Sequence, residues 1–220
     1  MTDKKYIGES DAYRARREAL LDAELDLLDQ CERVAALRRQ LPTNPVPTDY
    51  VFREGPVDLE KDEPIREARL SELFASGKDE LLVIHFMFDP AWEKGCPMCS
   101  MWADGYNAVA PHVAKRANLV VVAKQRIGPL RAWARERGWS NLRLLSAHDT
   151  AFIADFGMEG SGGQQPGVSS FRRNADGGIE HLTTVEAMNR GRFRGMDLLT
   201  PVWNLFDLLP GGRGDFMPSH

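Results

Sequence analysis

The hydrophobic residues of this chain are concentrated in a few short runs, of which residues 81–88 form the most continuous. This run, Leu-Leu-Val-Ile-His-Phe-Met-Phe, is too short to span a membrane and suits a strand buried on both faces. Shorter runs at residues 119–123 and 142–146 predict two further buried strands. Strands covered on both faces usually have parallel neighbours, so these runs indicate the centre of a parallel or mixed sheet.

Helical and hairpin patterns fill the intervals between and after these strands. The spacing of apolar residues predicts helices over residues 97–115, 128–137 and 150–157. A hairpin follows, with strands at residues 168–173 and 179–185 on either side of an Asn-Ala-Asp-Gly-Gly turn. The alternation of strands and helices predicts an α/β fold in which helices flank a central mixed sheet.

A long amphipathic pattern covers residues 11–40 and predicts a helix before the main domain. Its apolar residues recur at steps of three and four among many charges: Leu20, Leu21, Leu25, Leu28, Cys31, Val34 and Leu37. Ser10 is suited to cap the start of this helix. We expect the apolar stripe to be covered either by the main domain or by a second copy of the chain, which would form a homodimer through this helix.

Proline-rich sequence at residues 41–48 ends this helix, because proline cannot continue it. We therefore expect an N-terminal helical extension and linker over residues 1–48, followed by a main domain over residues 49–210. A last amphipathic helix is expected at residues 196–209, and residues 211–220 are expected to form a loose tail.

Composition and charge narrow the classes to which this protein can belong. The 220 residues are 43% hydrophobic and 27% charged, which is typical of a soluble globular protein. A net charge of −4 argues against nucleic-acid binding, and no apolar run approaches the roughly 18–20 residues of a membrane helix. The charged N-terminus shows no signal-peptide pattern and there are only three cysteines, so a cytoplasmic, reducing setting is expected.

The chemistry suggested by the sequence lies directly after the 81–88 strand, where Cys96 and Cys99 form a CxxC motif. The order of strand, loop, CxxC and helix places Cys96 at a helix N-terminus, where unpaired backbone N–H groups and the helix dipole favour a thiolate. Pro97 fits the first helical position because its missing N–H would have no partner there. Cys99 lies about one turn further on, close enough to form a disulfide with Cys96, and is expected to be covered.

Two alternative roles for this motif stay open on the residues alone. A CxxC pair also serves as half of a zinc site, although the sequence has neither a second CxxC nor an HxxxH pattern. The second alternative is that both thiols are inert and buried in the core, as free cysteines often are. Among neighbouring residues, Lys94 is expected to be a solvated loop lysine and His85 a hydrogen-bonded core histidine. Cys31 is expected to be a free structural thiol.

The order of these elements resembles the thioredoxin superfamily. A closer resemblance is to a thioredoxin-like family of uncharacterised bacterial proteins with a GCPxCS motif. The residues that carry it are His85-Phe86-Met87-Phe88, Gly95-Cys96-Pro97-Met98-Cys99-Ser100 and Trp102-Ala103-Asp104. The resemblance covers roughly residues 12–216 and implies a thioredoxin-like fold with a dithiol site.

The layout is also similar to the peroxiredoxin (AhpC-TSA) branch, because an extra strand and helix lie between residues 128 and 157. The likeness to a peroxidase site is incomplete, since Lys94 stands where that family has a threonine and Cys96 comes one residue early. Thioredoxin-like proteins have a cis proline that opens the strand facing the dithiol and helps to hold the substrate. Pro166 occupies that place in the order, so the resemblance implies that Pro166 is cis and binds substrate, with an ordinary trans loop proline as the alternative.

These observations predict a thiol-disulfide oxidoreductase in which Cys96 is the nucleophile and Cys99 resolves the mixed disulfide. We expect a protein or small-molecule disulfide as substrate, an unidentified dithiol as reductant, and neither cofactor nor metal. Trp92 is expected to form a hydrophobic rim for the substrate. A peroxiredoxin-like thiol peroxidase and a non-catalytic thioredoxin-fold interaction protein are the alternatives.

Overall fold

The computed structural model describes residues 6–187, 200–212 and 214–219. The chain divides into two compact units, Met1–Pro42 and Thr43–His220. This boundary lies earlier than the end of the linker expected from the sequence, since residues 44 and 45 already pair with the sheet of the second unit.

The first unit contains the long helix α1 (Asp11–Arg39). Ser10 caps its start, as the sequence predicts: the side-chain oxygen of Ser10 accepts a hydrogen bond from the backbone N–H of Tyr13 at 3.2 Å. The helix buries none of its residues, and leucines of the predicted apolar stripe, Leu20 and Leu28 among them, are exposed. Within the described residues of the first unit, nothing therefore covers the apolar stripe of α1.

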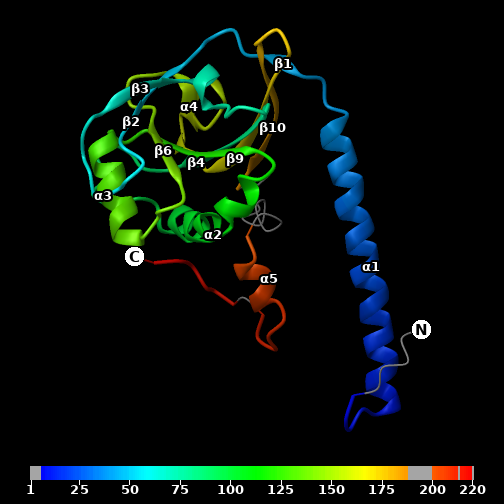
Figure 1. The fold of residues 1–220 in the computed structure, drawn as a ribbon. Helices are drawn as coiled ribbons and strands as arrows, with labels where there is room; N and C mark the ends of the chain where they lie inside the picture. Colours follow the sequence, from blue (N-terminus) through cyan, green and yellow to red (C-terminus); the bar gives the residue numbers. More distant parts are fainter. Residues whose placement is uncertain (1–5, 188–199, 213, 220) are drawn as a thin grey trace. The chain divides into compact units, whose positions relative to one another are not determined.

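The second unit is built on a mixed sheet, whose described strands follow the order β1-β10-β9-β4-β5-β6-β2-β3 (Figure 1). β4, β5 and β6 run parallel to one another, and β4 lies between the parallel β5 and the antiparallel β9. The strand bounds are β1 Asn44–Pro45, β2 Val51–Glu54, β3 Arg66–Arg69, β4 Glu80–Phe86, β5 Asn118–Ala123, β6 Arg143–Ser146, β9 Gly167–Arg173 and β10 Ile179–Glu186.

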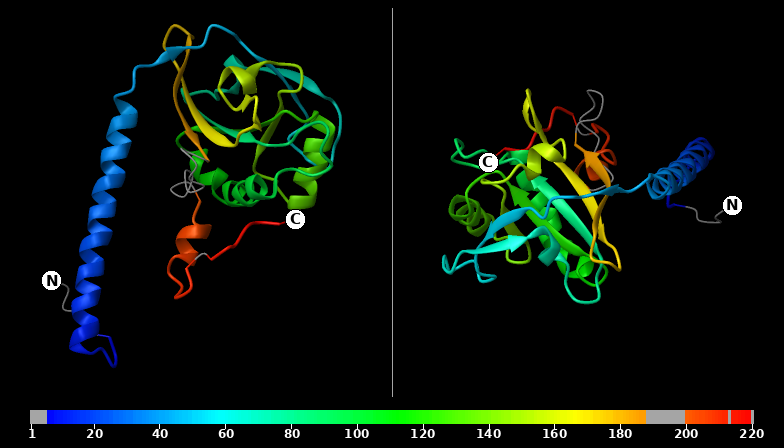
Figure 2. Two further views of the ribbon diagram at one scale, coloured as in Figure 1. Left: turned by 180° about the vertical axis from the view of Figure 1, so that it is seen from behind. Right: turned by 90° about the horizontal axis from the view of Figure 1, so that it is seen from above.

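Helices cover both faces of this sheet. α2 and α3 pack on one face, and the 3-10 helix η1 and α4 pack on the other (Figures 1 and 2). The remaining bounds are η1 Leu70–Leu73, α2 Pro97–Val113, α3 Ile127–Arg137, α4 Phe152–Asp155, β7 Glu159–Gly160, β8 Gly163–Gln164 and α5 Val202–Phe206. The α/β class and the central mixed sheet predicted from the sequence are confirmed.

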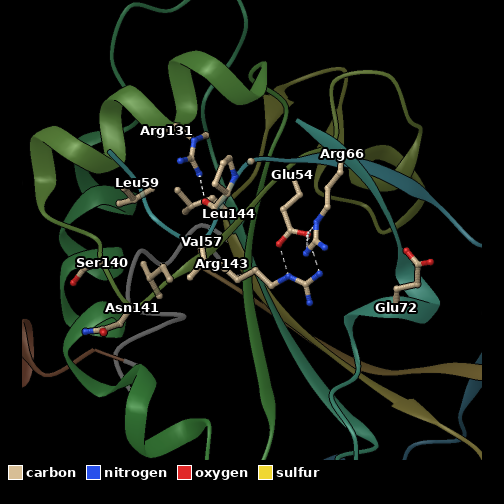
Figure 3. A pocket seen from close by; sticks show the side chains of 13 residues that line it. Glu54, Val57, Leu59, Arg66, Glu72, Arg131, Ser140, Asn141, Arg143 and Leu144 are labelled. Carbon is tan, nitrogen blue, oxygen red and sulfur yellow. Dashed lines mark hydrogen bonds and ion pairs between the residues drawn. The ribbon is translucent and has the colours of Figure 1, made fainter. Parts of the chain in front are cut away.

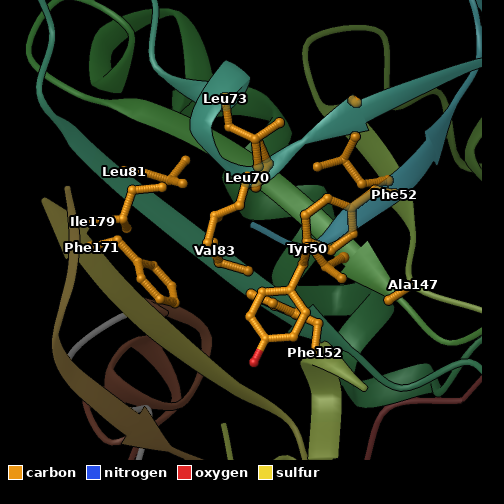
Figure 4. Close-up of a cluster of buried hydrophobic side chains, with 14 of the residues drawn as sticks. Tyr50, Phe52, Leu70, Leu73, Leu81, Val83, Ala147, Phe152, Phe171 and Ile179 are labelled. Carbon is orange, nitrogen blue, oxygen red and sulfur yellow. The ribbon is translucent and has the colours of Figure 1, made fainter. Parts of the chain in front are cut away.

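The alternation of side chains along β4 divides the core into two clusters. Ile84 and Phe86 belong to the cluster under α2 and α3, whereas Val83 belongs to the cluster around Phe152 on the opposite face (Figure 4). Successive residues of a strand point to opposite faces, so a strand covered on both sides needs an almost unbroken apolar run. The predicted burial of this run on both faces is confirmed.

Three segments differ from the sequence-based expectations. β3 buries only Ala68, so its Arg-Glu-Ala-Arg sequence gives no hydrophobic signal for a strand. Residues 159–167 are polar and rich in glycine and give no strand pattern, yet part of this stretch folds into the β7–β8 hairpin. Of the helix expected over residues 196–209, the structure describes α5 followed by turns, and residues 196–199 lie outside the described residues.

Candidate functional site

Cys96 is held at the junction between β4 and α2. The backbone N–H of Cys96 donates to the carbonyl oxygen of Met87 at 3.0 Å, and Pro97 takes the first helical position. Gly95, directly before the cysteine, is buried and packs closely against aromatic rings of the core. The end of the strand therefore fixes where the helix begins, and the positions predicted for Cys96 and Pro97 are confirmed.

Ser100 fastens the first turn of α2 to Cys96. Its backbone N–H and its hydroxyl each donate to the Cys96 carbonyl oxygen at 2.9 Å. The indole N–H of Trp133, on α3, donates to the Ser100 hydroxyl oxygen at 3.1 Å. Two helices thus position the backbone of Cys96. Sequence reasoning missed Trp133, because no spacing along the chain indicates that α3 packs its indole against this turn.

The two thiols differ in exposure and in acidity. Cys96 is partly exposed, Cys99 is 1% exposed, and both are free. The pKa of Cys96 is lowered to about 6, first by a hydrogen bond from the Cys99 thiol and then by backbone N–H groups of Cys99 and Met98, against the opposing effect of burial. Burial raises the pKa of Cys99 well above its ordinary value, and the neighbouring Cys96 raises it further. At neutral pH the pair therefore presents a Cys96 thiolate and a protonated Cys99.

A cavity of about 400 Å³ lies beside Cys96. Methionines from three parts of the chain contribute to its wall: Met87 after β4, Met98 in the first turn of α2, and Met217 near the C-terminus. Pro218 lies beside Met217 in the same wall. The loose tail expected at residues 211–220 stays a prediction, although two of its residues contribute to this wall. Nothing in the sequence links residue 217 to residue 96, so this part of the wall was not predicted.

Pro166 lines the same cavity, but its peptide bond is trans. Among the described residues the cis peptide bond is Glu63–Pro64, so the cis isomer implied for Pro166 by the resemblance is wrong. Backbone hydrogen bonds fix the position of this stretch. The Gln165 N–H donates to the Met158 carbonyl oxygen at 2.8 Å, and the Pro166 carbonyl oxygen accepts from the N–H of Ala187 at 3.0 Å. These bonds are formed with the lower-energy trans isomer. Contact between Pro166 and substrate stays a prediction.

Trp92 and Lys94 lie in the loop between β4 and α2, apart from the cavity wall. Trp92 is 41% exposed and is not among the residues that line the cavity beside Cys96. Its backbone N–H donates to the Asp89 carbonyl at 2.9 Å, within the turn. Lys94 is exposed and is not among the groups that lower the pKa of Cys96. The structure thus places Pro166 in the cavity wall beside Cys96 and leaves Trp92 outside that wall.

His85 is a core histidine, as expected, on the sheet face opposite Cys96. Its ring Nε2 lies 2.8 Å from the Ser169 hydroxyl, which lies 2.7 Å from the Thr184 hydroxyl. The ring of His181 contacts the same Thr184 hydroxyl at 2.8 Å. Burial, with a smaller effect of His181, lowers the pKa of His85 to about 3. His85 is therefore neutral and has no role as a base for the cysteines.

A second cavity, of about 450 Å³, lies between α3, β6 and the loop after β2 (Figure 3). The buried Glu54 carboxylate accepts hydrogen bonds there from Arg66 and Arg143, with shortest N···O distances of 3.0 and 2.6 Å. The Arg131 guanidinium donates to backbone carbonyls of the loop and ties the loop to α3. This cavity shares no lining residue with the one beside Cys96, so the two are separate sites.

The described residues contain no group of three or more histidine, cysteine, aspartate or glutamate side chains placed to hold a metal ion. Within the same residues, every helix is too short or too polar to cross a bilayer.

The sheet order and the flanking helices are those of a thioredoxin-like fold. A solved structure of a peroxiredoxin matches with a TM-score of 0.50 and 14% identity, over 66% of this chain and 84% of its own. Peroxiredoxin Q from Xanthomonas campestris matches at 0.46 and 14%, over 60% and 81%. The Plasmodium falciparum antioxidant protein, a 1-Cys peroxiredoxin, matches at 0.48 and 12%, over 67% and 84%. At these identities the likeness concerns the fold alone, and the predicted thioredoxin-like fold is confirmed.

The family of the chain follows from a separate comparison. Residues 2–219 match the model of a family described as a bacterial protein of unknown function (DUF899), and the chain belongs to that family. A search of curated proteins found no match. The expected membership of a bacterial family with a thioredoxin-like fold is therefore confirmed, while the GCPxCS motif as a mark of that family stays a prediction.

Proposed function

We propose that this protein is a thiol-disulfide oxidoreductase that works through Cys96 and Cys99. The observation that carries the proposal is the asymmetry of the pair. Cys96 is partly exposed beside a cavity and has a lowered pKa, whereas Cys99 is buried with a raised pKa. Dithiol exchange requires an accessible thiolate and, about one helical turn away, a second thiol that is protonated.

The reaction proceeds in two exchanges. The Cys96 thiolate attacks one sulfur of a substrate disulfide, the substrate S–S bond breaks, and the departing thiolate takes a proton from water. Cys99 then loses its proton to solvent and attacks the Cys96 sulfur, which releases the second substrate thiol and leaves a Cys96–Cys99 disulfide. The substrate gains two electrons and the protein loses two. A second dithiol restores the pair by the same exchange.

Disulfide exchange fits these residues better than peroxide reduction. The residue at the place of the peroxiredoxin threonine is Lys94, which is exposed and has no hydroxyl to orient a thiolate or a peroxide. Cys99 is also close enough to hydrogen-bond Cys96, so the resolving thiol is already in place before any substrate arrives.

A redox titration with mass-spectrometric thiol trapping tests the proposal. The chain would carry Cys31→Ser, so that only the motif thiols remain. We expect one reversible disulfide, with a midpoint of about −270 to −200 mV if the protein is a reductant like thioredoxin or glutaredoxin. Two thiols that never pair would overturn the dithiol mechanism. Rapid conversion of Cys96 to a sulfenic acid by hydrogen peroxide, without pairing, would instead point to a peroxidase.

A further inference from the structure

The wall of the cavity beside Cys96 is largely apolar and uncharged. Apart from the Cys96 thiolate itself, none of its described lining residues carries a charge. Methionine, proline, alanine and glycine make up the wall around Cys96, with the amides of Gln164 and Gln165 as the polar side chains. Methionine has an unbranched, polarisable side chain that adapts to apolar groups of different shape. A wall of this kind favours uncharged, apolar groups and offers a carboxylate no cation.

The polar side chain of Gln164 is already engaged within the protein. Its Oε1 accepts from the backbone N–H of Phe88 at 3.2 Å, and its Nε2 donates to Asp89 Oδ2 at 3.1 Å. The amide is therefore oriented by the fold, and it holds an acidic side chain behind this part of the wall. A negative charge there disfavours anionic groups in the cavity.

The C-terminal segment supplies part of this wall, and its position is anchored. Figure 2 shows the segment leading from α5 back past α2. Phe216 stacks edge-on against Phe206 of α5 with ring centroids 5.0 Å apart, and Phe206 packs on the core cluster that contains Phe86. Met217 and Pro218 follow directly and reach the cavity. The aromatic pair thus places Met217 opposite the first turn of α2.

We propose that Met217 is a specificity-determining residue, which completes an uncharged cavity that selects disulfides flanked by apolar groups. The proposal rests on the proposed function and names its substrate class. Disulfides whose neighbouring groups are carboxylates, such as glutathione disulfide, are poor substrates because the wall offers their charges no cation. The substrate class is an apolar peptide disulfide.

Two matched peptides test this selection in the full chain carrying Cys31→Ser. Both are acetylated and amidated tripeptides with a central cysteine activated as a 2-pyridyl disulfide, one flanked by leucines and the other by glutamates. Attack by Cys96 on the peptide sulfur releases pyridine-2-thione, whose absorbance gives the second-order rate constant. The small 2,2′-dipyridyl disulfide serves as the reference reaction. The variants are Met217→Lys and, as the matched control, Leu208→Lys, at a residue of the same segment that is 78% exposed and outside the wall.

The expected rate constant for the leucine peptide exceeds that for the glutamate peptide by about tenfold or more in the unmodified wall. Met217→Lys should lower this ratio by at least about fivefold, because its ammonium attracts the glutamates and repels no leucine, while Leu208→Lys leaves the ratio unchanged. Equal rates for the two peptides, or a ratio that Met217→Lys does not change, would overturn the assignment of Met217. Failure of 2,2′-dipyridyl disulfide to react with Cys96 would overturn the proposed function itself, and the specificity with it.

Discussion

Gly95 and Phe86 approach so closely that the glycine has no room for a side chain. A β-carbon on Gly95 would lie 2.6 Å from Cζ of Phe86 and 2.8 Å from Nε1 of Trp133, well inside van der Waals contact. Phe86 is the last residue of β4. The indole N–H of Trp133 donates to the Ser100 hydroxyl, which donates to the carbonyl oxygen of Cys96. Gly95 therefore lies where the aromatic core packs directly against the segment that carries Cys96.

Gly95→Ala should destabilise the fold and disturb the site together. Pushing apart the two rings is expected to lower the free energy of unfolding by about 1–3 kcal/mol. Gly105→Ala is the matched control, since a β-carbon on Gly105 meets nothing within 4 Å and the residue lies within α2. That change should raise stability by roughly 0.5–1 kcal/mol through helix propensity. Urea unfolding measures both, and a Gly95→Ala variant as stable as the parent chain would contradict the packing argument.

The reactivity of Cys96 should follow its lowered pKa. Its rate of alkylation by iodoacetamide is expected to reach half its maximum near pH 6 and to level off above about pH 7. Cys99→Ala removes the largest stabilising hydrogen bond and should move the profile to higher pH. Cys99→Ser keeps a hydroxyl donor and should move it less. A profile centred above about pH 8 in the chain carrying only Cys31→Ser would contradict the assignment.

The roles of the two cysteines should separate in single variants. Cys96→Ser is expected to abolish reduction of 2-hydroxyethyl disulfide, because the buried Cys99 has neither access nor a thiolate. Cys99→Ser should still attack but stall as a mixed disulfide on Cys96, which intact mass spectrometry detects. Turnover in Cys96→Ser comparable to the parent chain would reverse the assignment of nucleophile.

Burial of neutral His85 should make the fold sensitive to acid. Its pKa is about 3 in the folded chain and 6.5 in the unfolded one, so the unfolded state binds a proton first as pH falls. The stability contributed by the neutral ring is full above pH 6.5 and is lost progressively toward pH 3, amounting to roughly 2–3 kcal/mol by pH 4. His181, whose pKa is also lowered by burial, adds to the same trend.

His85→Phe keeps a ring to pack near Phe152 and removes the titrating group. Urea unfolding between pH 7 and pH 4 should show a shallower decline for this variant, whatever its stability at pH 7. His112→Gln, at an exposed position of α2, is the control and should decline like the parent chain. Parallel declines of His85→Phe and the parent would rule out His85 as a source of the acid sensitivity.

The parts of the fold that could be predicted are those that depend on local sequence patterns. The apolar run of β4, the CxxC motif and the prolines and glycines at element ends depend on neighbours a few residues away, and they predicted the central sheet and the position of Cys96. β3 could not be predicted in this way, because it buries a single alanine and is held by pairing with β2. Its pairing partner, not its own composition, makes it a strand.

In the candidate site, the sequence predicted residues that lie close together in the chain, but not residues that reach the site through tertiary packing. Cys96, Cys99 and Pro97 lie within four residues, and their relative positions follow from helix geometry. Met217 and Trp133 reach the site through tertiary packing, for which the sequence carries no spacing rule. Order in the fold placed Pro166 near the dithiol, but order alone does not determine the isomer of a peptide bond. Trp92 is close to Cys96 in sequence, yet the turn keeps it outside the cavity wall.

The two edge strands of the sheet affect the tendency of this protein to aggregate at high concentration. β1, at one edge of the sheet, is two residues long and includes Pro45, which has no backbone N–H to offer an incoming strand. β3, at the other edge, exposes Arg66, Glu67 and Arg69. A fibril that grows by strand addition would find poor templates at both of these strands, because short, proline-containing or charged edge strands resist pairing with another chain.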